Sequence, residues 1–211
     1  MRPLTLTTPK PLLSYRGTTN LDHLFAALPH EIDEAIITID YLGQQIREYC
    51  GDNFYGRSIK YVQGSSDGNA LGFLATKSYI TLGERFAVAY GDEVFAGDEI
   101  SRCFAHEYSW ICYPVEDPTK VGVVSVDDKG FITQIVEKPL QPESNLAADG
   151  FMIINADIFD YPLEKHTNGE YIFADLMKQF VLDHSVYAVM GSPGHQQLTT
   201  PTDIEYLNQT V

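Results

Sequence analysis

An acidic pair follows an apolar run near the middle of the chain. Asp92 and Glu93 come just after Phe86–Tyr90, a run that predicts a buried strand. Open α/β sheets collect ligands at the carboxyl ends of their strands. A carboxylate there suits Mg²⁺, which proteins hold through one or two carboxylates plus substrate phosphates. An aspartate in this position can equally cap a turn or the next helix, so the pattern leaves both roles open.

A lysine between two prolines is the second candidate. Lys10 lies in a Pro-Lys-Pro stretch, within a segment over 1–17 that we predict to be an extended loop rather than a helix or strand. The stiff backbone would present the ammonium group with little conformational entropy left to lose, which suits binding of a phosphate. The alternative is a solvated surface lysine.

Glu137 and Lys138 end the second strand of a predicted hairpin and precede a proline. At the end of a strand, adjacent side chains point to opposite faces or splay apart. The carboxylate could accept a hydrogen bond from a sugar hydroxyl, and the ammonium group could pair with a sugar phosphate. The alternative is an exposed ion pair that contributes almost nothing to stability.

The segment over 62–68 reads as the end of a strand followed by a loop of small residues that leads into a helix. Gly68 would let a flat ring approach the backbone, and the Gln63 amide can both donate to and accept from the edge of a nucleobase. A plain strand-to-helix turn would explain the same residues.

Helix and strand patterns alternate along the chain that positions these residues. We predict helices over 21–28, 43–52, 69–80, 98–107 and 173–184, and strands over 34–42, 58–63, 85–92, 108–115, 150–159 and 185–191. Period-two alternation around an Asp-Lys-Gly turn predicts a β-hairpin over 121–139. The sequence therefore predicts an α/β fold: a three-layer, doubly wound, mostly parallel (Rossmann-like) sheet with a β-hairpin insertion in its second half.

The charge balance limits the kinds of molecule that this protein can bind. Lys and Arg number 14 against 29 Asp and Glu, giving a net charge of −15. This balance argues against nucleic acid or an anionic membrane as partner, because both require a basic face. An anionic substrate must then be held by a few placed lysines or a metal ion.

The cysteines and the apolar runs indicate in which cellular compartment the protein is expected. Cys50, Cys103 and Cys112 show no Cys-x-x-Cys spacing, which indicates reduced thiols rather than a disulfide or zinc site. No apolar run reaches the length of a membrane span, and the first residues do not resemble a signal peptide. We therefore expect a cytoplasmic protein.

Five stretches together resemble the sugar-phosphate nucleotidylyltransferases, most closely the glucose-1-phosphate thymidylyltransferase type. They are RPLTLTTPKPLL at 2–13, VQGSSDG at 62–68, GDEVFAGDE at 91–99, EDPTKVGVV at 116–124 and EKPLQPESN at 137–145. The resemblance implies an enzyme that joins a nucleoside triphosphate, of the dTTP or UTP class, to a sugar-1-phosphate. The products are a nucleotide-sugar and pyrophosphate, and Mg²⁺ is the implied cofactor. Such enzymes are often oligomeric, so a homo-oligomer is possible.

The resemblance also implies roles for the nucleotide side of the site. Lys10 would be the catalytic contact to the phosphates, and Asp92 would be a ligand of Mg²⁺. Gln63 and Gly68 would form the nucleobase pocket.

On the sugar side, the resemblance implies that Gly122 and Glu137 face the sugar and that Lys138 holds its phosphate. In-line attack on the α-phosphorus needs positioning and charge neutralisation more than a covalent group, which two lysines and a metal ion would supply.

The sequence departs from the family pattern in two places. Family members begin with a central strand and a Gly-x-Gly-Thr-Arg loop ahead of the part that matches 1–11, and no such segment precedes Met1 here. We therefore expect one nucleotidyltransferase domain over 1–211, truncated at its N-terminus, in which two strands have lost a shared neighbour. Near the end, His195 and Gln197 stand where the family has a tryptophan and a metal-binding aspartate.

Two functional hypotheses follow from these departures. The first is a nucleotidyltransferase whose reading frame begins upstream. The second is a non-catalytic homologue that binds nucleotide-sugar as a partner or sensor subunit. A third option is a truncated, poorly stable product without activity.

Overall fold

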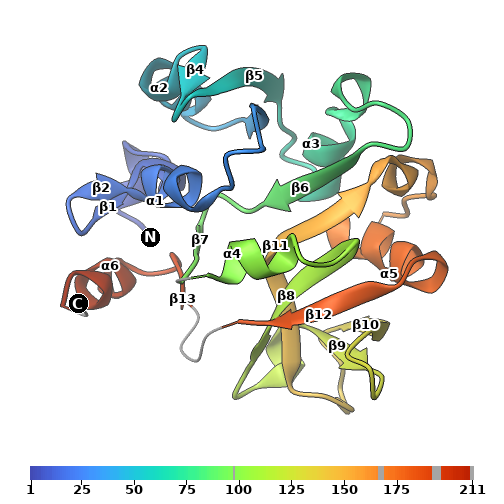
Figure 1. Ribbon diagram of the computed structural model, residues 1–211. Helices are drawn as coiled ribbons and strands as arrows, with labels where there is room; N and C mark the ends of the chain where they lie inside the picture. The colour runs from blue at the N-terminus through green and yellow to red at the C-terminus, as the bar shows by residue number, and fades with distance from the viewer. Residues whose placement is uncertain (97, 166–168, 192–195, 210–211) are drawn as a thin grey trace.

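The strands form two main sheets of unequal size in the described part of the chain (Figure 1). The computed structural model describes residues 1–96, 98–165, 169–191 and 196–209. The small sheet has the order β3-β5-β4, with bounds β3 (Glu34–Ile39), β5 (Arg57–Gln63) and β4 (Asn53–Phe54). The large sheet contains β6 (Arg85–Ala89), β8 (Tyr108–Pro114), β9 (Gly122–Val126), β10 (Ile132–Glu137), β11 (Leu146–Asn155) and β12 (Val186–Met190).

Two short antiparallel pairs, six α-helices and five 3₁₀ helices complete the described elements. The pairs are β1 (Ser14–Tyr15) with β2 (Thr18–Thr19), and β7 (Glu93–Val94) with β13 (Gln196–Gln197). The helices are α1 (Asn20–Ala27), α2 (Gly43–Cys50), α3 (Asn69–Leu74), α4 (Glu99–Cys103), α5 (Phe173–Asp183) and α6 (Pro201–Gln209). None of these helices is long and apolar enough to cross a membrane.

The side chains of β11 alternate between two hydrophobic cores, one on each face of the large sheet. Met152 and Ile154 pack into the core that contains α3 and α5. Phe151 and Ile153 pack into the core that contains α1, α2 and α4. Period-two burial of this kind requires helices on both faces, so the predicted three-layer α/β fold is confirmed.

The direction of β11 makes the sheet mixed. β11 is antiparallel to both β6 and β8, and β12 is parallel to β8. Strands β6, β8 and β12 therefore run in one direction, as a doubly wound fold requires, and β11 runs against them. The predicted hairpin is present, because β9 and β10 pair antiparallel.

The N-terminal segment and α3 differ from their predictions. The segment over 1–17, predicted as an extended loop, contains two 3₁₀ turns, Leu4–Leu6 and Lys10–Leu12, and the short strand β1. The helix predicted over 69–80 stops at Leu74, and the 3₁₀ helix Lys77–Tyr79 follows it. The Thr76 hydroxyl donates to the carbonyl of Phe73 at 2.7 Å, which favours a tighter turn where the α-helix would have continued.

A buried arginine fastens α1 to the small sheet. Arg57, 5% exposed, lies in β5. Its guanidinium donates to the carbonyls of Phe25, Leu28 and Pro29 at 3.3, 2.7 and 2.9 Å. These carbonyls belong to the end of α1 and the turn after it, where a helix leaves acceptors unpaired. One side chain thereby satisfies them and fixes the position of the helix.

Strands β3 and β6 are less buried than their apolar sequences predict. In β6, Arg85 is exposed and the other residues are partly exposed, and in β3 only Ile39 is fully buried. In β8, by contrast, all the residues between Tyr108 and Pro114 are buried. The expectation of a buried β6 is therefore wrong along most of its length. The reason is that one edge of each half-exposed strand faces a cavity.

Candidate active site

Lys10 and Asp92 form an ion pair beyond the carboxyl end of β6. Their Nζ and Oδ2 atoms are 3.0 Å apart, and the side chains are 37% and 29% exposed. The lysine opens a 3₁₀ turn behind Pro9, and Pro11 packs against Gly91 so closely that a Cβ there would lie 3.0 Å from its ring. Two residues that are 82 positions apart in the sequence thus meet at the predicted edge of the sheet.

A buried asparagine at the start of α1, which the sequence did not single out, holds the Asp92 loop. The Asn20 amide donates to the carbonyls of Gly91 and Glu93 at 2.9 and 3.1 Å. Its oxygen accepts from the Tyr15 hydroxyl at 3.1 Å. Burial raises the pKa of Tyr15 to about 12, so this hydroxyl remains a donor at neutral pH. The sequence signal for this role is limited to a polar residue that directly follows the cap Thr19 at the start of a helix.

Gln197 bonds to a buried glutamate beside the site. Its Nε2 donates to Oε1 of Glu93 at 2.7 Å, and Glu93 is 1% exposed. A carboxylate at position 197 could not donate this hydrogen bond and would repel its neighbour. His195 lies outside the described residues. Asp203, the other carboxylate near this stretch, accepts from the backbone N–H groups of Thr199 and Thr200 at the start of α6.

Gly122 and Glu137 lie opposite each other in the hairpin. A Cβ on Gly122 would come within 2.9 Å of Glu137 Oε2, so the carboxylate lies over the glycine. Lys138 has a left-handed backbone with φ of 44°, and its Nζ is 3.5 Å from Glu137 Oε1. The expectation that these two adjacent side chains diverge is therefore wrong, because the left-handed turn brings them together. With Lys138 64% exposed, the contact is the exposed ion pair considered as the alternative.

The two halves of the site converge on one stretch of β11. β8 pairs along one edge of β11, while β6 and β9 share the other edge. β6 reaches β11 at Phe151 with its last residue, Ala89, and β9 reaches it at Ala147 through Val123. The carboxyl end of β6 and the start of β9 therefore approach each other across residues 148–150, where the pairing with β8 shifts register. This arrangement brings the Asp92 loop and the Gly122–Glu137 pair to the same edge.

The predicted nucleobase residues remain with the small sheet. Gln63, at the end of β5, donates to Asp40 Oδ1 at 3.2 Å. Gly68 has φ of 131°, and a Cβ on it would overlap with the carbonyl oxygen of Tyr171. A glycine is required there because two backbone segments cross. Among the described contacts, neither residue touches Lys10 or Asp92, and their roles toward a base stay predictions.

A cavity of about 800 Å³ opens beside the Lys10–Asp92 pair. Pro11, Gly91 and Asp92 line one end, and residues of β3 and β6 form its walls. Within the described part of the chain, its lining includes neither Glu137 nor Lys138. The cavity therefore adjoins the nucleotide side of the predicted site rather than the sugar side.

The donor set fits Mg²⁺ only if substrate completes it. The described residues contain no cluster of three or more His, Cys, Asp or Glu side chains that could hold a metal ion. Asp92 offers one partly exposed carboxylate, and Gln197 uses its amide to hold Glu93. One carboxylate with phosphate oxygens and water is an arrangement that Mg²⁺ accepts.

The sequence profile of the family described as nucleotidyl transferase matches residues 1–194, so the chain belongs to this family. It is 28% identical over 213 residues to the bifunctional protein GlmU of Methanocaldococcus jannaschii, covering 99% of this chain and 50% of GlmU. It is 28% identical over 187 residues to the UTP–glucose-1-phosphate uridylyltransferase AglF of Haloferax volcanii, covering 81% of this chain and 74% of AglF. The chain thus spans about half the length of GlmU.

The fold is also that of a solved structure. A putative glucose-1-phosphate thymidylyltransferase from Bacillus anthracis, in complex with a sucrose, superposes with a TM-score of 0.82 at 21% identity. The match covers 99% of this chain and 89% of that one.

Proposed function

We propose that this chain is the nucleotidyltransferase domain of an enzyme that joins a nucleoside triphosphate to a sugar-1-phosphate. The observation that carries the proposal is the 3.0 Å Lys10–Asp92 pair at the carboxyl end of β6. Ligands of α/β sheets bind at this edge, and the pair supplies one cation for phosphate and one carboxylate for a metal ion. We propose UTP or dTTP as the nucleotide, because AglF is a uridylyltransferase and the Bacillus anthracis protein is a putative thymidylyltransferase.

The proposed reaction is a single displacement. A phosphate oxygen of the sugar-1-phosphate attacks the α-phosphorus of the triphosphate. The bond from that phosphorus to the oxygen bridging to the β-phosphate breaks, and pyrophosphate leaves with that oxygen. No proton needs to be transferred, so the contribution of the protein is to position the two substrates and to neutralise their charge.

Each predicted residue has a task in this reaction. Lys10 pairs with the triphosphate, Lys138 holds the sugar phosphate, and Glu137 accepts from a sugar hydroxyl over Gly122. Mg²⁺, when bound through Asp92, would neutralise phosphate charge. Gln63 and Gly68 are proposed to contact the base.

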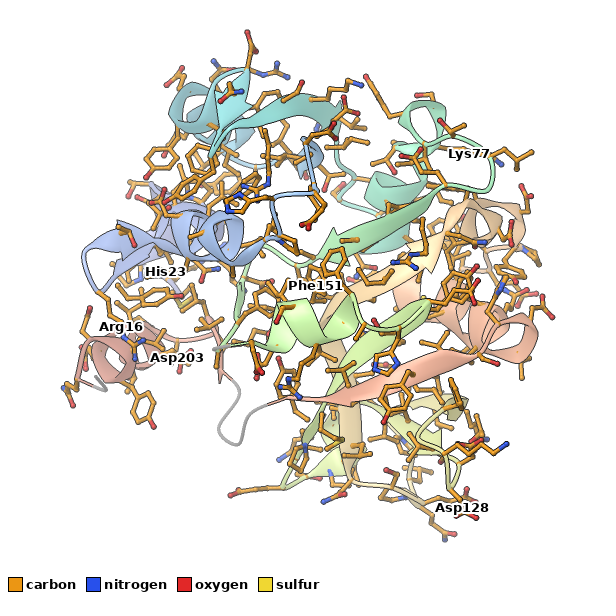
Figure 2. The ribbon with its side chains drawn as sticks, viewed as in Figure 1. Arg16, His23, Lys77, Asp128, Phe151 and Asp203 are labelled. Atoms are coloured by element: carbon orange, nitrogen blue, oxygen red, sulfur yellow. The ribbon has the colours of Figure 1, made fainter. Side chains whose placement is uncertain are left out.

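The test measures how fast the complete enzyme that contains this domain releases pyrophosphate. The substrates are UTP or dTTP together with glucose-1-phosphate. We expect Lys10→Ala and Asp92→Asn each to lower kcat/KM about 10²-fold, the typical cost of removing one group that stabilises transition-state charge. Lys77→Ala is the matched control, because Lys77 also pairs with an aspartate at 3.0 Å, namely Asp160. Figure 2 shows Lys77 at the outer edge of the molecule, on the side away from α6. Equal activity of all three variants would remove the proposed site.

The second candidate is a non-catalytic homologue that binds nucleotide-sugar. The observation in its favour is Gln197, which gives its amide to Glu93 and supplies no carboxylate. Calorimetry with UDP-glucose and dTDP-glucose separates the two functions. Binding by a full polypeptide that releases no pyrophosphate from any pair of substrates would favour the second candidate.

A further inference from the structure

Lys10 and Asp92 give each other the contacts that the two proposed ligands would need. Nζ of Lys10 and Oδ2 of Asp92 are 3.0 Å apart, and within the described residues neither side chain has another ion-pair partner. The same ammonium group is proposed to pair with the triphosphate, and the same carboxylate is proposed to bind Mg²⁺. Because opposite charges at this distance neutralise each other, their mutual contact competes with both of these tasks.

The ion pair is accessible to ligands and contributes little to the stability of the fold. Its side chains are 37% and 29% exposed, and water and salt screen ion pairs at such exposure. Glu93, the next residue of the same loop, is 1% exposed and accepts a hydrogen bond from Gln197 at 2.7 Å. Asp92 is therefore the carboxylate of this acidic pair that a ligand can reach, and a polyanion can separate it from Lys10 at small cost.

The backbone is held in place on both sides of the ion pair. The Leu13 N–H donates to the Lys10 carbonyl at 3.0 Å, and the Leu198 N–H donates to the Asp92 carbonyl at 2.9 Å. The Asn20 amide holds the carbonyls on either side of Asp92. A change of partner therefore requires rotation of the two side chains only, which the flexible four-carbon stem of lysine allows.

The charges of the ligands decide which partner each side chain prefers. A triphosphate carries several negative charges, so it attracts the Lys10 ammonium group more strongly than one carboxylate does, and it repels Asp92. A divalent ion attracts Asp92 and repels Lys10. The net charge of −15 offers the triphosphate no general attraction, so its binding depends on placed cations such as Lys10.

We propose that the Lys10–Asp92 ion pair is an autoinhibitory contact that couples the binding of the triphosphate to the binding of a divalent ion. Asp92 holds Lys10 back from a triphosphate, and Lys10 holds Asp92 back from a divalent ion. When Lys10 turns to the triphosphate, the Asp92 carboxylate is released, so each ligand raises the affinity for the other. This coupling rests on the proposed function, since both ligands are taken from it. It adds that Asp92 opposes nucleotide binding when no divalent ion accompanies the nucleotide.

The test compares the binding of UTP in EDTA and in Mg²⁺, measured by calorimetry on the complete enzyme that contains this domain. In EDTA, Asp92→Asn should bind UTP about fivefold more tightly than the unmodified protein, because a neutral amide competes less for Lys10. In Mg²⁺, the same variant should bind UTP about tenfold more weakly, because a carboxylate ligand of the metal ion is lost. Damage to the loop would weaken binding in both conditions, so a change of sign is not explained by a merely structural role.

A double-mutant cycle separates the release of Lys10 from a general loss of negative charge. Lys10→Met keeps the apolar stem of the side chain and removes its charge. In EDTA, adding Asp92→Asn to Lys10→Met should give no gain in UTP affinity, because no ammonium group is left to release. Asp160→Asn is the matched control, since it removes one negative charge and breaks the Lys77–Asp160 pair, which is also 3.0 Å long. It should leave UTP affinity unchanged in both conditions.

The outcomes separate this coupling from the proposed function. Weaker binding by Asp92→Asn in both conditions, or a gain in EDTA that persists with Lys10→Met, would overturn the coupling and leave the proposed function standing. If the unmodified protein binds neither UTP nor dTTP in either condition, the proposed function is wrong, and the coupling fails with it. None of these readouts depends on pyrophosphate release.

Discussion

Strands β8 and β11 are built from apolar residues similar to those of β3 and β6, but the two sets of strands differ in burial. Ile153 and Ile154 of β11 are 1% and 0% exposed, because the strand is paired along both edges and covered on both faces. Ile36 and Ile37 of β3 are partly exposed, because within the described residues that strand is paired along one edge only. The difference shows that apolar composition makes a segment a strand, whereas its neighbours decide whether it is buried.

The largest expected difference is in the cost of removing core side chains. Ile153→Ala should lower the free energy of unfolding by about 2–5 kcal/mol, since the side chain leaves a cavity in a closed core. Ile37→Ala should cost about 1 kcal/mol, because less apolar area returns to water. Urea denaturation measures both variants. Equal losses would mean that the two regions are packed equally well.

The next effect concerns Gly68, in the loop that leads from the small sheet to α3. The backbone of this loop packs against Tyr171, just ahead of α5. Gly68→Ala combines a left-handed backbone, about 1 kcal/mol, with an overlap on Tyr171 that adds about 1–3 kcal/mol. Gly83→Ala is the control, because Gly83 has φ of 75° and nothing within 4 Å of its Cβ position. Thermal unfolding of the two variants separates strain from overlap. If Gly83→Ala costs as much as Gly68→Ala, the crossing with Tyr171 has no effect on stability.

A smaller effect is expected at the start of α1, which touches both regions. Thr19 and Asp22 form a capping box, in which each side chain bonds to the other residue's backbone N–H. Thr19→Ala should therefore cost about 1 kcal/mol of unfolding free energy. Thr202→Ala, on the exposed side of α6, should change stability by less than about 0.5 kcal/mol. An unchanged midpoint for Thr19→Ala in urea denaturation would contradict this role.

The smallest effect is on alkaline stability. Burial raises the pKa of the Cys103 thiol, beside the large sheet, to about 12 and that of Cys50, beside the small one, to about 11. Because the thiol pKa is higher in the folded than in the unfolded chain, each thiol stabilises the fold in its protonated form. This contribution is fully present below the unfolded pKa of about 9. It is lost as the pH rises through 9 toward the folded pKa values of about 11 and 12. The loss should be about 0.4 kcal/mol per thiol at pH 9. Urea titrations at pH 7 and pH 9 measure this loss. Cys50→Ala and Cys103→Ala should each remove the part of the loss that comes from its own thiol.

Reactivity of the same thiols separates the two regions further. All three cysteines are free and buried in the structure. Alkylation by iodoacetamide followed by mass spectrometry should label Cys50 before Cys103, because the small sheet has fewer neighbours to keep it closed. The opposite order would show that the half-paired region is the more stable one.

The sequence predicted most elements and the three-layer class, because apolar periodicity is local information. It did not predict that β11 runs antiparallel to its neighbours, since an apolar run has the same appearance in either direction. The half-exposure of β3 and β6 was missed for a related reason: pairing along an edge depends on residues elsewhere in the chain.

The site was predictable to the extent that its residues lie at the ends of strands. Lys10 and Asp92 lie 3.0 Å apart, and their roles toward phosphate and metal stay predictions. The positioning role of Asn20 was missed, because its two acceptors lie 71 and 73 residues away. The left-handed turn at Lys138 was missed because a lysine gives no signal for positive φ.

Arg57 and Asn20 act on opposite ends of the same helix. Arg57 clamps the carbonyls at the end of α1, and Asn20 holds the Asp92 loop from its beginning. A helix is stiff along its axis, so α1 connects the small sheet rigidly to the loop that carries the Asp92 carboxylate. The small sheet and the loop that carries Asp92 are therefore held by one short helix, although they belong to separate sheets.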